Sequence, residues 1–299
     1  MKRFVKDIIY GVLFFCLVWG LMEWAMAVAP CVNEYAYKYH YIQHNDSIKT
    51  LLIGNSYFEN SINPHYLGDS VFDFANSGRW IYFDVQLMPR IVDEMPNLKT
   101  VIFPMGYDRP YHSLHYDSLR DIDKDYIYYY EKSMHILYDR FPENIWYSSA
   151  LVTNKFGLQY WSFYPKDKLG YSSLDGQRDN WHNEQIFEPK YMQSDKADLC
   201  YKEYRMYLMQ LAQICAQKKL RFVVVTCPCA DCYLAKTTDK GLRRLYDLVD
   251  SVAAYYPIEY YNYLDDQQFR ADSIYYNASH LNTIGADMFA KRLKDDLGL

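Results

Sequence analysis

A serine near the start of the chain and a histidine near its end are the residues best suited to chemistry. Ser56 closes the run Leu-Leu-Ile-Gly-Asn-Ser, in which an apolar stretch stops abruptly at Gly-Asn-Ser. His280 lies within Asn-Ala-Ser-His-Leu-Asn, residues 277–282. A serine hydroxyl can attack an acyl carbon when a neighbouring imidazole takes its proton. If the two segments meet in the folded chain, this pair can therefore carry out acyl transfer.

Each of these motifs also has an ordinary structural explanation. Gly-Asn-Ser is a common strand-to-helix turn in which Ser56 would serve as a helix N-cap. Gly78 would be a turn glycine, Asn277 an Asx-turn residue, and His280 a polar residue that opens a helix. The functional interpretation is favoured only by the joint occurrence of the motifs, in the order and at the places where a parallel sheet would gather them.

The elements that would position these residues alternate between strand and helix. Short apolar runs closed by turn residues are typical of buried parallel strands. This alternation predicts an α/β domain over 49–299, a three-layer, flavodoxin-like parallel sheet of about five strands with right-handed crossovers. Such sheets bind ligands at the carboxyl ends of their strands, where Ser56, Gly78 and His280 would converge. Strands are predicted at 50–53, 71–75, 100–105, 220–226 and 257–261, and helices at 80–95, 198–219, 238–255 and 283–297.

Residues 109–197 interrupt the alternation with dense tyrosine and tryptophan and patchy periodicity. We interpret this segment as an aromatic-rich insertion. It would either cap the carboxyl edge of the sheet or form a helical packing layer without a role in binding, and the sequence favours neither.

The first thirty residues carry a separate signal. Basic residues precede an apolar run over 8–29 that would span about 33 Å as a helix, close to the thickness of a bilayer core. The charge distribution predicts a cytoplasmic N-terminus and an exported body, so we expect a single-pass inner-membrane protein that faces the periplasm or the exterior. The alternative is a signal peptide cleaved near Ala25-Met26-Ala27. Residues 31–48 are predicted to be a linker.

Composition narrows the classes of partner. The net charge of −5 argues against nucleic-acid binding, and the 33 tyrosines provide aromatic surface suited to carbohydrate. Cys227, Cys229 and Cys232 form a cluster after the predicted fourth strand. Three thiols without a nearby histidine are a weak metal signal, so a disulfide or a plain loop is favoured over a metal-binding or redox site. We expect no metal and no cofactor.

In the order of these motifs the chain resembles the SGNH/GDSL hydrolase superfamily. Gly54-Asn55-Ser56 is similar to its first block, Asn76-Ser77-Gly78 to its second, and His280 with the following Leu-Asn to its last. The resemblance implies that Ser56 is the nucleophile, that the Ser56 and Gly78 amides are oxyanion donors, and that His280 is the base. It also implies an ester substrate.

The chain departs from the family pattern at two positions. The third block should supply an asparagine donor, but Gly106-Tyr107-Asp108 stands there; Tyr107 could substitute, and Asp108 is the neighbouring candidate. Asn277 occupies the place of the aspartate that orients the histidine. The alternative partners of the histidine ring are Asp265 and Asp272, in the preceding loop. We therefore expect a serine esterase or O-acyltransferase acting on cell-envelope carbohydrate. The alternative is a catalytically degenerate relative that binds an envelope polymer or a membrane partner.

Overall fold

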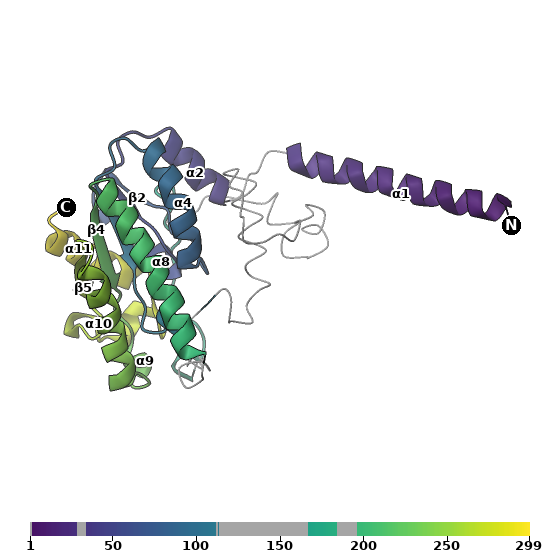
Figure 1. Cartoon of the computed structure of the whole chain (residues 1–299). Coiled ribbons are helices and arrows are strands. Elements are labelled where there is room, and N and C mark those ends of the chain that lie inside the picture. Colours follow the sequence, from purple (N-terminus) through teal and green to yellow (C-terminus); the bar gives the residue numbers. More distant parts are fainter. Residues whose placement is uncertain (1, 29–33, 112, 114–166, 184–195) are drawn as a thin grey trace. The chain divides into compact units, whose positions relative to one another are not determined.

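The computed structural model describes residues 2–28, 34–111, 113, 167–183 and 196–299. They belong to two compact units, residues 1–39 with 121–164 and residues 40–120 with 165–299. In the first unit, helix α1 (Lys2–Val28) contains the segment Arg3–Met22, with a mean hydropathy of 1.9. This helix is long and apolar enough to cross a membrane, a property that an anchor shares with a signal sequence (Figure 1).

The second unit is built on a five-stranded parallel sheet, which confirms the predicted fold class. The strand order is β2-β1-β3-β4-β5, the flavodoxin-like order in which the chain reverses direction across the sheet between β1 and β3. Leu51 lies between Phe72 of β2 and Val101 of β3 in the register. The strands are β1 (Thr50–Leu52), β2 (Val71–Asp73), β3 (Thr100–Pro104), β4 (Arg221–Thr226) and β5 (Glu259–Asn262).

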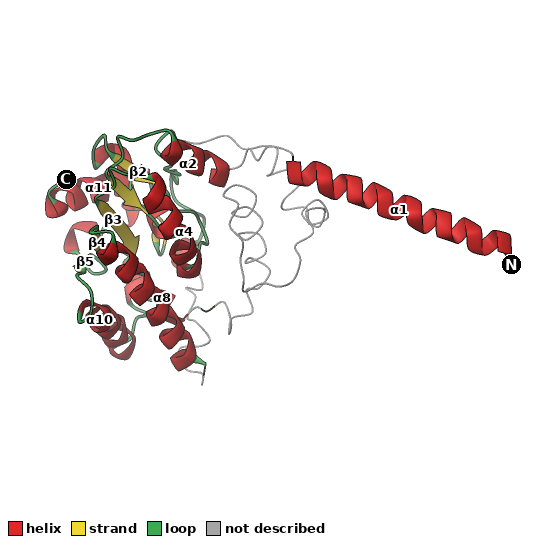
Figure 2. Cartoon of the chain, turned by 45° about the horizontal axis from the view of Figure 1, so that its top comes forward, coloured by secondary structure: helices red, strands yellow, loops and turns green. Residues whose placement is uncertain are grey.

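Helices cover both faces of this sheet, as the three-layer prediction requires. Figures 1 and 2 show α4 (Ile81–Glu94), α8 (Ala197–Gln217) and α10 (Asp239–Ala253) together on one side and α11 (Thr283–Leu297) on the other. Alternate side chains of a strand point to opposite faces, so each central strand must be apolar throughout. Ile102 and Val223 accordingly belong to the buried cluster that contains Phe289 and Leu293 of α11.

Two segments differ from a simple alternation. Helix α2 (Glu34–Gln43) lies within residues 31–48, where the sequence suggests only a linker. A small antiparallel hairpin, β6 (Tyr275–Asn277) and β7 (His280–Leu281), precedes α11. The two strands of this hairpin have three and two residues and no apolar run, so the sequence gives no strand signal there.

Most of the expected insertion at 109–197 lies outside the described residues. Its longest described part, residues 167–183, follows the edge of the sheet. The Asp73 amide donates to Leu169 at 2.9 Å, and the Ser172 amide donates to Glu59 at 3.0 Å. Farther along, the Thr283 amide at the start of α11 donates to Leu174 at 2.9 Å. This part of the segment therefore runs from β2 toward the residues that precede α11.

Candidate active site

Ser56 is presented by a turn whose backbone requires glycine. Gly54 has φ of 102°, and a Cβ atom there would lie 2.5 Å from the Pro104 ring. Helix α3 (Ser56–Glu59) follows, and its N-cap is Asn55, whose side-chain oxygen accepts from the Tyr57 amide at 3.0 Å. The N-cap role is thus filled by Asn55, which leaves the Ser56 hydroxyl available for another partner.

A buried ion pair holds this turn in place. Asp84 Oδ1 accepts from the Gly54 amide at 3.2 Å and from Arg79 Nη1 at 3.1 Å. The Asn76 amide donates to the Gly54 carbonyl at 3.0 Å, which ties the loop after β2 to the loop after β1. Burial raises the pKa of Asp84 to about 6, although Arg79 acts in the opposite direction.

His280 is presented by the β6–β7 hairpin, which is fixed at the start of α11. Asn282 is the N-cap of α11 and accepts from the Gly285 amide at 3.1 Å. Its amide nitrogen donates to the Ser273 carbonyl at 2.8 Å. One side chain therefore joins the segment before the hairpin to the helix after it, which limits the freedom of the hairpin between them.

The two predicted chemical groups meet. His280 Nε2 lies 2.9 Å from Ser56 Oγ, and His280 Nδ1 lies 3.0 Å from Asn277 Oδ1. Because an amide oxygen can only accept, Asn277 favours the tautomer with the proton on Nδ1. In that tautomer the Nε2 lone pair accepts the serine proton, which is the arrangement that activates a nucleophile.

The oxygen of Asn277 is shared among several donors. It also accepts from the backbone amides of Ser279 at 3.1 Å and His280 at 2.9 Å, so Asn277 forms an Asx turn as well as orienting the ring. Ser279 Oγ lies 3.1 Å from His280 Nδ1 and is a second neighbour of that nitrogen. Asp272 instead pairs with His182 at 2.9 Å, and Asp265 pairs with Arg270. Of the three side chains considered from the sequence, Asn277 is therefore the one at the ring.

The imidazole is held neutral by its surroundings. Its ring stacks on Tyr57, with centroids 5.4 Å apart and an interplanar angle of 8°. Burial and the positive charge of Arg109 lower the pKa of His280 to about 4, against a weaker opposing effect of Asp108. A neutral ring at pH 7 can act as a base, but forming the imidazolium is correspondingly unfavourable.

The remaining sequence-predicted residues lie around this pair in different ways. Gly78 has φ of 75° and is in the exposed turn after β2. Tyr107 turns toward α10, where its hydroxyl accepts from the Thr238 amide at 3.0 Å. Asp108 is buried and accepts from the Tyr57 hydroxyl at 3.2 Å. Asp108 therefore supports the ring that stacks on His280, while the Tyr107 hydroxyl is engaged elsewhere.

Sequence reasoning missed Tyr57, Arg79, Asp84 and Arg109 as parts of the site. Tyr57 and Arg109 directly follow the candidates Ser56 and Asp108, so adjacency was the available signal. Arg79 and Asp84 are five residues apart and carry no recognisable motif. Their importance depends on burial, which brings both side chains to about 1% exposure or less.

The cysteine cluster lies behind the site as free thiols. Cys227 and Cys229 are buried, and Cys227 Sγ donates weakly to the Tyr57 carbonyl at 3.6 Å. Burial raises the pKa of both thiols, so neither is a ready nucleophile. Among the described residues, no group of three or more His, Cys, Asp or Glu side chains could hold a metal ion.

Comparisons with known proteins add a structural likeness only. No family model and no curated protein sequence matches the chain. Among solved structures, one described as a "putative platelet activating factor" from Streptococcus pneumonia aligns with a TM-score of 0.46 and 12% sequence identity. The alignment covers 94% of this chain and 98% of that chain. A likeness at this level assigns no activity.

Proposed function

We propose that the chain is a serine esterase or O-acyltransferase that acts on ester groups of cell-envelope carbohydrate. The observation that carries the proposal is the 2.9 Å contact between Ser56 Oγ and His280 Nε2, formed with the other ring nitrogen on Asn277. The motif resemblance to SGNH/GDSL hydrolases supports the same assignment. Aromatic side chains in the chain supply surfaces on which sugar rings can pack.

In the proposed reaction, Ser56 Oγ attacks the acyl carbon while its proton moves to His280 Nε2. The amides of Ser56 and Gly78 donate to the oxyanion of the tetrahedral intermediate. Collapse of the intermediate breaks the ester bond, and the imidazolium returns its proton to the departing sugar oxygen. Water or a second hydroxyl then attacks the acyl-enzyme, with His280 again taking the proton. The entering group decides between hydrolysis and transfer.

The Ser56 and Gly78 amides are suited to this role because neither donates to another group within the described residues. The hydrogen bond from the Asn76 amide to Gly54 brings the two loops together, which supports a shared oxyanion site. The third donor of the family pattern is not supplied by the Tyr107 hydroxyl, which is bonded to Thr238.

The experiment is acetate release from acetylated glycans and from p-nitrophenyl acetate by the soluble body, comparing wild type with Ser56→Ala. We expect the substitution to reduce turnover by at least a thousandfold, because the nucleophile is lost. A folded wild type that cleaves no better than Ser56→Ala on every ester tried would refute the hydrolase proposal.

The amide at position 277 favours one second candidate, a non-catalytic domain that binds an envelope polymer or a membrane partner. Without a carboxylate, nothing at Asn277 offers a negative charge to the imidazolium. This candidate predicts that polymer binding is the same in wild type and Ser56→Ala, and that neither protein cleaves esters.

We further propose that α1 anchors the chain in the inner membrane with its body outside the cytoplasm. Lys2, Arg3 and Lys6 at the start of the apolar helix support this orientation. Protease added to intact spheroplasts should degrade the body but spare a cytoplasmic control protein. Full protection of the body under conditions that leave it digestible after lysis would overturn the orientation.

A further inference from the structure

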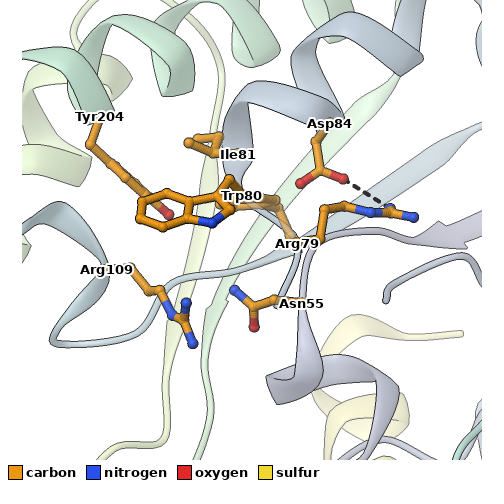
Figure 3. A pocket seen from close by; sticks show the side chains of 8 residues that line it. Asn55, Arg79, Trp80, Ile81, Asp84, Arg109 and Tyr204 are labelled. Carbon is orange, nitrogen blue, oxygen red and sulfur yellow. Dashed lines mark hydrogen bonds and ion pairs between the residues drawn. The ribbon is translucent and has the colours of Figure 1, made fainter. Parts of the chain in front are cut away.

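A small pocket lies beside the nucleophile turn and is distinct from the Ser56–His280 pair. Asn55, Trp80, Asp84, Arg109 and Tyr204 are among its lining residues, whereas Ser56 and His280 are not (Figure 3). Arg109 nevertheless reaches the catalytic pair, because its guanidinium packs 5.2 Å from the centre of the Tyr57 ring, which stacks on His280. The pocket therefore includes the residue directly before Ser56, and one aromatic ring, that of Tyr57, separates Arg109 from His280.

Arg109 has a buried hydrogen-bond donor that no group among the described residues uses. Its side chain is 22% exposed, and its buried Nε has no hydrogen-bond partner. The nearest carboxylate atom, Asp108 Oδ2, is 3.8 Å from Nε, beyond hydrogen-bond distance. A guanidinium carries five N–H donors in a fixed fork, and a largely buried one normally finds acceptors. Here no acceptor for Nε is present among the described residues.

A second donor faces the same space. The side-chain oxygen of Asn55 is used by the Tyr57 amide, which leaves its NH₂ group pointing away from the cap. Figure 3 shows the nitrogen of Asn55 turned toward the guanidinium of Arg109. No acceptor for this NH₂ group is found within the described part of the chain. An acceptor placed between these two donors would satisfy both.

The other charges of the pocket do not provide that acceptor. Arg79 and Asp84 pair with each other at 3.1 Å, and Figure 3 shows Asp84 turned toward Arg79 rather than Arg109. Asp108 already accepts from the Tyr57 hydroxyl and is not a lining residue. Among the described residues, Arg109 is thus the lining cation with an unpartnered buried donor, and Asp84 Oδ2 is a lining carboxylate oxygen without a partner.

We infer that Arg109, with the Asn55 NH₂ group, binds an acidic group of the carbohydrate whose ester Ser56 attacks. The acidic group is a carboxylate or a phosphate, the two planar or multidentate anions that a guanidinium fork recognises. The partly exposed indole of Trp80 lines the same pocket and can pack against the attached sugar. The inference rests on the proposed function for its substrate, but the anion site can be measured without turnover.

The binding experiment uses the Ser56→Ala protein with D-glucuronate, inorganic phosphate and D-glucose, measured by isothermal titration calorimetry. We expect one of the two anions to bind and glucose to bind at least tenfold more weakly. Adding Arg109→Gln should weaken binding of that anion at least tenfold. Adding Arg243→Gln, which removes the same charge from an exposed position on α10, should not weaken it. The anion that binds identifies the acidic group as carboxylate or phosphate.

The kinetic experiment compares acetylated D-glucuronate with acetylated D-glucose, which differ in the carboxylate. For a carboxylate site, Arg109→Gln should lower the ratio of kcat/KM for the acidic ester to that for the neutral ester at least tenfold. An unchanged ratio with an equal loss on both esters would overturn the inference, because Arg109 would then serve the oxyanion or the fold.

Two further outcomes keep the test decisive. If Arg109→Gln does not fold, Arg109→Lys replaces it, and we expect at least a threefold loss of affinity because the planar fork is removed. An affinity for either anion that is the same in all variants overturns the site. Anion binding that depends on Arg109 in a protein that cleaves no ester supports the site while refuting the hydrolase, so the two failures are distinguishable.

Discussion

Asn277→Asp should stabilise the positively charged form of His280, because a carboxylate would replace the neutral amide beside the ring. The amide oxygen lies 3.0 Å from His280 Nδ1 and accepts from two backbone amides, and a carboxylate oxygen can make the same three contacts. The substitution therefore adds charge with little change in shape. The added charge stabilises the imidazolium that forms when Ser56 gives up its proton.

The magnitude follows from the geometry. At a separation of 3.0 Å and an effective dielectric constant of about 20, a unit charge on each group interacts by about 5.5 kcal/mol. This energy corresponds to roughly four powers of ten in rate. It agrees with the loss of about 10⁴-fold when a triad aspartate becomes asparagine in serine proteases. Because the new carboxylate must itself be partly desolvated, we expect a gain in kcat/KM of about 10² to 10⁴.

The assay is acetyl-ester cleavage with a pH–rate profile, together with an NMR titration of His280. The pKa of His280, about 4 in the wild type, should rise by roughly 1 to 3 units in Asn277→Asp. Asn97→Asp adds the same charge at an exposed position and should change neither quantity. If Asn277→Asp keeps its fold but leaves both the rate and the pKa unchanged, Asn277 does not act on the ring as described.

Three further outcomes are expected. The lowered pKa means that His280 loses its base form only as the pH falls through about 4. The wild-type kcat/KM should therefore be flat between about pH 5 and 8. A midpoint of the pH profile near 6.5 would contradict the burial described for the ring. Arg79→Met should lower the free energy of unfolding, measured in urea, by about 3–5 kcal/mol, because Asp84 is left buried and unpaired. The double variant Arg79→Met/Asp84→Leu should recover part of this loss. A loss under about 1 kcal/mol in Arg79→Met would show that the ion pair is unimportant for stability. Gly54→Ala should lower the free energy of unfolding by about 1–3 kcal/mol and ester cleavage at least tenfold, because the new Cβ atom meets Pro104. Gly176→Ala, also at positive φ but in open space, should lower stability alone. Equal activity in both variants would contradict the role of the Gly54 turn.

The sheet and the pair Ser56–His280 were predictable because both depend on strong local patterns. The run from Leu51 to Ile53 ends at a glycine turn, and Phe222 to Val225 is apolar without interruption, so each stretch marks a buried strand by itself. The parallel topology then requires the carboxyl ends of the strands to share one edge, which brings position 56 toward position 280.

The supporting residues were not predictable because tertiary contacts decide their roles. Tyr107 was the sequence candidate to replace the missing asparagine donor, yet Thr238 binds its hydroxyl and Gly241 leaves the room for its ring. The β6–β7 hairpin depends on Asn277 and Asn282, whose amides bond backbone groups several residues away. Neither effect leaves a periodic signal. The unpartnered donor of Arg109 can be recognised only when the neighbours of its guanidinium are known.

The proposed nucleophile and base are 224 residues apart in sequence. During synthesis Ser56 therefore emerges well before the imidazole that it contacts in the folded chain. The hairpin that carries His280 is then secured by the final helix. A chain cut short within α11 would keep both side chains but lose part of the helix that fixes the hairpin. The contact between Ser56 and His280 thus depends on tertiary structure that forms late in synthesis.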